Sequence, residues 1–69
     1  MLNRAVLKKK MEERGLTQAA LGEAVGATQA FIGFILTGRK QPSLALAVDI
    51  ARALGCTVDE LIEHEEEAV

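Results

Sequence analysis

Residues 16–38 read LTQAALGEAVGATQAFIGFILTG, and this stretch decides the fold. Two short segments with helical periodicity lie on either side of Gly26, and each follows a threonine, Thr17 or Thr28, whose hydroxyl can cap a helix. A glycine directly after a periodic segment is typical of the left-handed residue that ends a helix. The stretch predicts two helices, over residues 18–25 and 29–37. Joined by so short a turn, they make a helix-turn-helix.

Three more periodic segments flank this stretch and predict helices over residues 3–14, 44–54 and 58–63. Ser43 can cap the second of these, and Pro42 keeps the preceding segment extended. Thr57 and Glu60 have the spacing of a capping box, in which each side chain bonds the backbone N–H of the other residue. No segment alternates apolar and polar residues for long enough to predict a strand. The sequence therefore predicts a compact all-α domain of five helices.

The predicted core takes one face of each helix, because apolar residues recur at three- and four-residue spacing. The residues expected to point inward are Leu7, Met11, Leu21, Val25, Ile32, Ile35, Leu36, Leu44, Ala47, Ala51 and Leu54, with Val48 and Ile50 flanking them. In the last predicted helix Leu61 turns inward. Val58 and Ile62 would then lie one turn apart and share an exposed stripe.

Charge divides the chain into a body, residues 1–62, and an acidic tail, residues 63–69. The body carries eight Lys and Arg against six Asp and Glu, whereas the tail carries four glutamates and no Lys or Arg. The net charge of −2 therefore comes from the tail. A mildly basic body is compatible with binding DNA, because the distribution of charge matters more than its sum.

The composition argues against several other classes of protein. Cys56 and His64 are the only cysteine and histidine, so an internal disulfide is impossible and a structural zinc site is not expected. We expect Cys56 to pack in the core, and its reduced thiol favours a cytoplasmic location. No apolar run approaches the roughly 18 residues that span a membrane. Without a catalytic constellation or a phosphate-cradling loop, we expect no enzyme, no cofactor, no metal and no small-molecule ligand.

Residues 16–26 resemble the second helix of the Cro/repressor family, also called the XRE family. The resemblance continues in register and without gaps at Ile32, Ile35, Gly38, Pro42, Ser43, Leu44, Ala51, residues 53–55 and residues 59–61. It covers about residues 7–62 and implies the five-helix phage-repressor-like fold, with the helix over 29–37 in the DNA major groove. It also implies a DNA-binding transcriptional regulator that is commonly a dimer.

The resemblance suggests roles for single residues. Gln18 matches a glutamine that touches the DNA backbone and braces the next glutamine, and Gln29 stands where a glutamine can read adenine. Arg39 and Lys40 match a loop that lies along the phosphates, and Thr28 can touch phosphate as well as cap its helix. The predicted DNA-contacting residues are Gln18, Thr28, Gln29, Ala30, Gly33, Phe34, Thr37, Arg39 and Lys40. The alternative for both glutamines is a solvated helix residue, and the basic cluster Lys8, Lys9, Lys10 and Arg14 is assigned to solvent.

The outer face of the 29–37 helix departs from the family pattern. Ala30, Gly33 and Phe34 stand there, whereas family members commonly carry polar side chains. Apolar side chains can meet a thymine methyl group. Phe31 and Phe34 could instead form a docking patch for another protein. The alternative function is therefore a protein-interaction module or an antitoxin with little direct DNA binding.

A second departure concerns Met11 and Leu36. Many family members carry Arg and Glu at these two positions and form a partly buried ion pair between the first and third helices. Both charges are absent here, and losing only one of them would leave a buried charge unpaired. We therefore expect Met11 to pack against Leu36. The alternative is that Met11 covers the rim of the core while Leu36 packs on the fourth helix.

The chain is expected to act on double-stranded DNA as a homodimer. Val58, Leu61 and Ile62 are too apolar for a final solvated turn, and Val58 and Ile62 would form the dimer interface. Two-fold dimers are the commonest oligomers, and DNA regulators use them to read paired half-sites.

Overall fold

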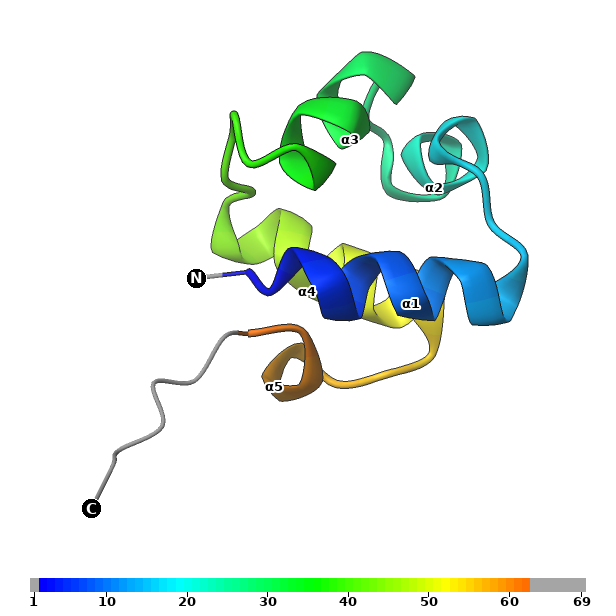
Figure 1. Ribbon diagram of the computed structural model, residues 1–69, viewed down its shortest axis with the longest axis vertical. Coiled ribbons are helices and arrows are strands. Elements are labelled where there is room, and N and C mark those ends of the chain that lie inside the picture. Colours follow the sequence, from blue (N-terminus) through cyan, green and yellow to red (C-terminus); the bar gives the residue numbers. More distant parts are fainter. Residues whose placement is uncertain (1, 63–69) are drawn as a thin grey trace.

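The computed structural model describes residues 2–62, which fold into five helices (Figure 1). The helices are α1 (Arg4–Arg14), α2 (Gln18–Val25), α3 (Gln29–Leu36), α4 (Leu44–Leu54) and α5 (Val58–Leu61). The predicted all-α, five-helix class is confirmed, and the bounds of α2 and α4 are those expected from the sequence. The acidic tail, residues 63–69, lies outside the described residues.

Local hydrogen bonds explain where the helices begin. The Thr17 hydroxyl accepts from the backbone N–H of Ala20 at 3.0 Å, and the Thr28 hydroxyl accepts from Phe31 at the same distance. Ser43 caps α4 in the same way, and Thr57 and Glu60 form the predicted capping box at α5. Asn3, which the sequence placed inside the first helix, instead caps it, and α1 begins one residue later.

The turn between α2 and α3 needs glycine at two positions. Gly26 has φ 76°, in the left-handed region that residues with a Cβ rarely adopt. At Gly22 a Cβ would lie 2.7 Å from the carbonyl oxygen of Ala27, so the turn could not fold back so closely over a larger residue. The N–H of Ala27 donates to the carbonyl of Gly22 at 2.8 Å and fixes this approach.

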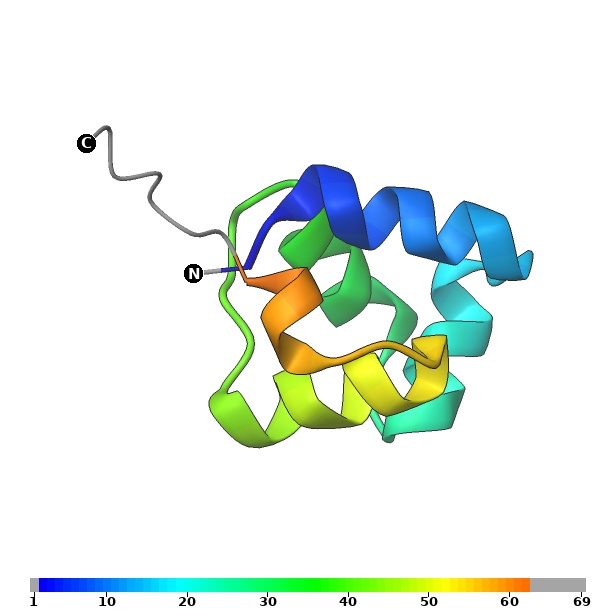
Figure 2. The ribbon, with the colours of Figure 1, turned by 90° about the horizontal axis from the view of Figure 1, so that it is seen from below.

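Figures 1 and 2 show α2 and α3 together on one side of the molecule, with α1 and α4 beneath them and α5 on the far side. Between these helices lies one core, whose fully buried side chains are Leu7, Leu21, Ile32, Ile35, Ile50, Leu54 and Leu61. Met11, Ala47 and Ala51 are buried as predicted, and Val25 and Leu36 pack against the core while half-buried.

The prediction for Leu44 is wrong. Its side chain is 72% exposed, whereas Ile50, expected only to flank the core, is fully buried. The inward face of α4 is formed by Ala47, Ile50, Ala51 and Leu54. Leu44 is the first residue of α4 and lies beyond this face, where it lines an open groove with Leu2 and Ile62.

The end of α5 also differs from the prediction. The helix stops at Leu61, and Ile62 takes up an extended conformation that pairs it with Leu2 in an isolated antiparallel bridge. The N–H of Asn3 donates to the carbonyl of Leu61 at 2.7 Å and reinforces this pairing. Val58 and Ile62 are both half-buried, so they do not form the exposed helical stripe that the sequence suggested. Leu61 is fully buried, as expected.

Candidate nucleic-acid interface

Helices α2 and α3 meet at 112°, which is the usual angle of a helix-turn-helix. Within residues 2–62 no single helix is both long enough and apolar enough to cross a membrane. Helices α2 and α3 reach that length and apolar composition only when they are taken together, and they are bent sharply where they meet. The geometry places α3 at the surface of the domain, where its outer face is free to meet another molecule (Figure 1).

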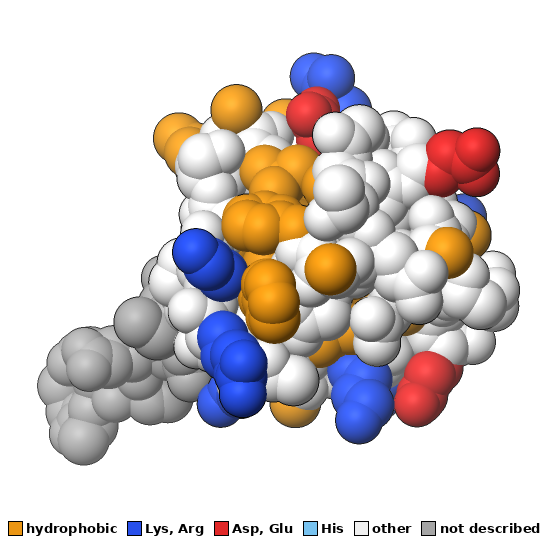
Figure 3. All heavy atoms as spheres, turned by 90° about the horizontal axis from the view of Figure 1, so that it is seen from above, with side chains coloured by type: hydrophobic (Ala, Val, Ile, Leu, Met, Phe, Trp, Pro, Cys, Tyr) orange, Lys and Arg blue, Asp and Glu red, His pale blue; other side chains and the backbone are white. Residues whose placement is uncertain are grey.

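The two sides of α3 point to different surroundings. Ile32 and Ile35 are buried in the core, whereas Ala30 and Phe34 are exposed on the opposite side. Figure 3 looks onto this outer side and shows apolar side chains across its centre, with Lys and Arg side chains along one edge. An exposed apolar centre with a basic edge is therefore the main feature of this face.

An open hollow of about 440 Å³ lies on this face and is called here the α3 hollow. Its lining residues are Gln18, Ala30, Gly33, Phe34, Leu36, Thr37 and Arg39. Six of the nine residues predicted to contact DNA are thus brought together. The other three, Thr28, Gln29 and Lys40, are exposed but do not line the hollow.

Gln18 reaches the α3 hollow because Gly33 has no side chain. A Cβ at Gly33 would lie 3.0 Å from Oε1 of Gln18, a separation tighter than ordinary contact. The carboxamide of Gln18 therefore lies directly over the backbone of α3. Among the hydrogen bonds of residues 2–62, none joins Gln18 to Gln29, and the bracing of one glutamine by the other on DNA stays a prediction.

The loop after α3 is held tightly to the helix end. The carbonyl of Phe34 accepts hydrogen bonds from the backbone N–H groups of Arg39 at 2.8 Å and Lys40 at 3.2 Å, and from the Thr37 hydroxyl at 3.2 Å. The Arg39 guanidinium lies over the Phe34 ring, 6.0 Å from its centroid. Such a contact is a weak cation–π interaction at an exposed site. The loop thus presents its two basic residues from a fixed backbone beside the apolar face.

Cys56 lies away from this face and packs against the core. Burial raises the pKa of its thiol, and the Glu60 carboxylate raises the pKa further. Since the thiolate is the reactive form, both effects suppress reactivity. This agrees with a packing role for Cys56.

Arg4 was not identified by the sequence reasoning. Its guanidinium lies against Gly38, directly before the Arg39–Lys40 loop. The signal in the sequence that could have drawn attention to Arg4 was its spacing from Lys8, because residues four apart stand one turn apart on a helix. Nothing in the sequence by itself relates Arg4 to a loop so far along the chain.

Family comparison agrees with this geometry. A family model described as helix-turn-helix matches residues 7–61. Two curated relatives, each named an uncharacterized HTH-type transcriptional regulator, come from Methanothermobacter thermautotrophicus and Archaeoglobus fulgidus. The first is 48% identical over 52 residues, covering 75% of each chain. The second is 36% identical over 53 residues, covering 77% of this chain and 76% of the relative.

The fold and its exposed α3 define a helix-turn-helix domain of the Cro/repressor type. The chain belongs to the helix-turn-helix family of transcriptional regulators, as the match over residues 7–61 and the relative at 48% identity show.

Solved structures share the fold. The P22 c2 repressor, crystallised with a synthetic operator, matches with a TM-score of 0.84 and 23% identity over 94% of this chain and 98% of that one. The controller protein C.AhdI from Aeromonas hydrophila matches with a TM-score of 0.81 and 25% identity over 86% and 89%. Hydroxypropylphosphonic acid epoxidase from S. wedmorenis matches with a TM-score of 0.79 and 24% identity, but only 32% of its chain is covered. The likeness to this enzyme thus concerns one part of it, whereas most of the length of the HTH-type transcriptional regulator and of the controller protein is covered.

Proposed function

We propose that this chain regulates transcription by binding a specific DNA sequence, with the outer face of α3 in the major groove. The observation that carries the proposal is the α3 hollow, in which six of the predicted contact residues from α2, α3 and the following loop meet. The P22 c2 repressor has the same fold and was crystallised with an operator, which supports this use of the face.

Each part of the face has a chemical role in this proposal. Gln29 stands exposed at the start of α3, where its carboxamide can bond N6 and N7 of adenine. Ala30 and Phe34 offer apolar contacts that suit a thymine methyl group. Arg39 and Lys40 contact phosphates, which position the protein without reading sequence. Thus α3 reads bases, and its flanking loop supplies affinity.

A gel-shift series with random-sequence duplex DNA at rising salt tests the proposal. A DNA-binding regulator binds in low salt and loses affinity steeply as salt rises, because phosphate contacts release counterions. The competing function is a protein-interaction module or an antitoxin that docks another protein on the exposed Phe34 surface. No binding to any duplex, even at low salt, would favour that competing function.

The regulator acts on paired half-sites as a homodimer in this proposal. Ile62 lines an open apolar groove with Leu44 and Leu2, and Val58 is half-buried nearby, with its carbonyl accepting from the Ile62 N–H at 3.1 Å. A second copy would cover this apolar surface and present two α3 helices at the spacing of successive major grooves. The interface predicted at Val58 and Ile62 therefore extends to Leu44.

Sedimentation at high micromolar concentration tests the dimer. The wild type should sediment as a dimer, whereas Ile62→Glu and Leu44→Glu should sediment as folded monomers. Leu44→Glu is the better probe of the interface, because Leu44 is 72% exposed and its replacement leaves the core untouched. A monomeric wild type would exclude the dimer while leaving DNA binding by single domains open to the gel-shift test.

A further inference from the structure

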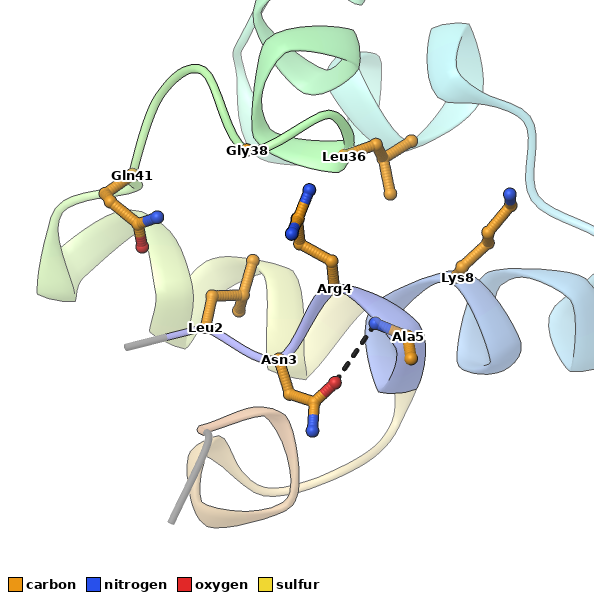
Figure 4. Close-up of a pocket in the computed structure, with 8 residues that line it drawn as sticks. All are labelled: Leu2, Asn3, Arg4, Ala5, Lys8, Leu36, Gly38 and Gln41. Carbon is orange, nitrogen blue, oxygen red and sulfur yellow. Dashed lines mark hydrogen bonds between the residues drawn. The ribbon is translucent and has the colours of Figure 1, made fainter. Parts of the chain in front are cut away.

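A second hollow, of about 700 Å³, lies between the start of α1, the end of α3 and the segment before α4; it is called here the α1 hollow. Figure 4 shows Arg4 and Lys8 projecting from α1 on the side that faces the end of α3. Leu36 lines both this hollow and the α3 hollow. The two hollows therefore adjoin at the C-terminal end of α3.

Among residues 2–62, the lining of the α1 hollow is positively charged. Arg4 and Lys8 are its charged residues, and no Asp or Glu of this part of the chain lines it. The ion pair found within residues 2–62 joins Lys10 to Glu60, so neither Arg4 nor Lys8 is neutralised by a carboxylate there. Two cations one turn apart, facing one hollow, suit an external anion.

Gly38 brings Arg4 up to the loop that carries the other basic residues. Gly38 has φ 83°, and a Cβ on it would lie 2.7 Å from Nη1 of Arg4. The guanidinium can therefore approach the backbone here only because this residue is glycine. Arg39 and Lys40 follow Gly38 directly in the chain, so Arg4 approaches the start of the segment that carries them.

Leu36 adds no charge to the lining of the α1 hollow. A Glu at position 36 would put a carboxylate into this lining together with Arg4 and Lys8, whereas leucine leaves the described lining without an acid.

We propose that the α1 hollow binds a phosphate group, supplied by the backbone of the DNA whose bases α3 reads, with Arg4 and Lys8 as its ligands. Arginine presents a planar fork of N–H donors that matches phosphate oxygens, and lysine adds a compact charge. Gln41, which also lines the hollow, can donate from its side-chain amide. This inference rests on the proposed function, and it moves Lys8 from the solvent-facing set to the DNA-facing set.

The experiment compares the salt dependence of duplex binding in Arg4→Gln, Lys8→Gln and the control Lys9→Gln. Lys9 lies on the same helix with the same charge, but it is exposed and does not line the hollow. Loss of one phosphate contact should reduce the slope of log K against log salt by about 0.9 in each of the first two variants. Lys9→Gln should keep the wild-type slope, and Arg4→Lys should recover most of the loss. Melting curves should be alike for all four, because the replaced side chains are exposed.

Equal slopes in Arg4→Gln, Lys8→Gln and Lys9→Gln would overturn the proposal. A second arm separates the two sources of phosphate by titrating the free protein with inorganic phosphate and following the amide resonances of Arg4 and Gly38. Weak, non-saturating shifts are expected. Saturable binding lost in Arg4→Gln, with unchanged DNA slopes, would assign the hollow to free phosphate and reject the DNA assignment.

The two proposals can fail separately. If the wild type binds no duplex, the proposed function fails. The phosphate titration then tests the α1 hollow by itself: larger shifts in the wild type than in Arg4→Gln would support a phosphate site, and equal shifts in the two proteins would reject one.

Discussion

The inner and outer faces of α3 are both apolar, yet only the inner face is buried. Ile32 and Ile35 are each 1% exposed, whereas Phe34, between them in the sequence, is 38% exposed on the other side of the helix. Burial of Ile32 and Ile35 explains the inner face, because removing apolar surface from water stabilises the fold. The gain is smaller on the outer face, because Phe34 keeps a larger share of its surface exposed. This exposed apolar surface is available for contact with another molecule.

The largest expected effect concerns the boundary between these faces, where Leu36 is half-buried and is predicted to pack against Met11. Met11→Arg or Leu36→Glu by itself should destabilise the domain by about 3–5 kcal/mol, since either leaves a charge without its partner in or beside the core. The double variant should recover part of the loss by restoring an ion pair. Urea unfolding of all four proteins gives the coupling energy. Additive losses would show that Met11 and Leu36 do not contact each other.

The next prediction compares the two faces directly. Ile35→Ala should cost about 2–5 kcal/mol of unfolding free energy, because it leaves a cavity in the core. Phe34→Ala should cost less than about 1 kcal/mol, since surface substitutions are usually small. Phe34→Ala should nevertheless weaken binding to the preferred DNA. If both variants lose stability equally, the outer face contributes to the fold as the inner face does, and the comparison fails.

A third prediction separates base reading from backbone contact on the outer side. Gln29→Ala should cost about 1–3 kcal/mol on the preferred site and relax specificity at one base pair. Lys40→Ala should weaken binding to all sequences alike and reduce the salt slope by about one. Binding constants on a panel of single-base variants measure both. A uniform loss on every sequence for Gln29→Ala would remove it from the reading role.

The smallest effect is expected far from α3, at the pair of half-buried Lys10 and exposed Glu60, whose Nζ and Oε1 atoms are 3.1 Å apart. The hydrogen bond from Lys10, aided by the backbone N–H of Thr57, holds the pKa of Glu60 below its ordinary value. The carboxylate therefore stabilises the fold above the ordinary range of Glu, and this contribution disappears as pH falls through the lowered pKa.

Glu60→Gln should therefore be slightly less stable than the wild type at neutral pH and equal to it in strong acid. Salt should reduce the difference, because solvent reaches both side chains. Glu23→Gln, at an exposed position of α2 where no ion pair is found, is the matched control. A difference between Glu60→Gln and the wild type that persists in acid would show that Glu60 acts through its capping bonds and not through its charge.

Sequence predicted the helix starts well because they depend on neighbours in the chain. Thr17, Thr28 and Ser43 cap their helices through bonds to residues three positions away. The inward faces followed from periodicity alone, apart from α4, where Leu44 is exposed and Ile50 is fully buried. Of the predicted contact residues, most of those on α3 and the loop meet at one hollow, because a helix and its flanking turn fix their relative positions.

The misses share a different cause. Leu44 is exposed because the core ends before the first residue of α4. Helix α5 ends early because Ile62 pairs with Leu2 at the other end of the described chain. The approach of Arg4 to Gly38 likewise joins distant parts of the chain. Local propensity and spacing contain no information on such contacts. The α1 hollow, which depends on them, therefore became visible only in the structure.

The pairing of Leu2 with Ile62 has a consequence for how the domain folds. It joins the two ends of the described chain, so forming it closes the longest loop in the domain and costs the most chain entropy. Helices α2 and α3 need only neighbouring residues to form, whereas Leu61 reaches its buried place as the chain closes. The contacts of longest sequence separation should thus form after the helix-turn-helix pair has come together. During synthesis, the DNA-facing part would gain its helices before the core beneath it is complete.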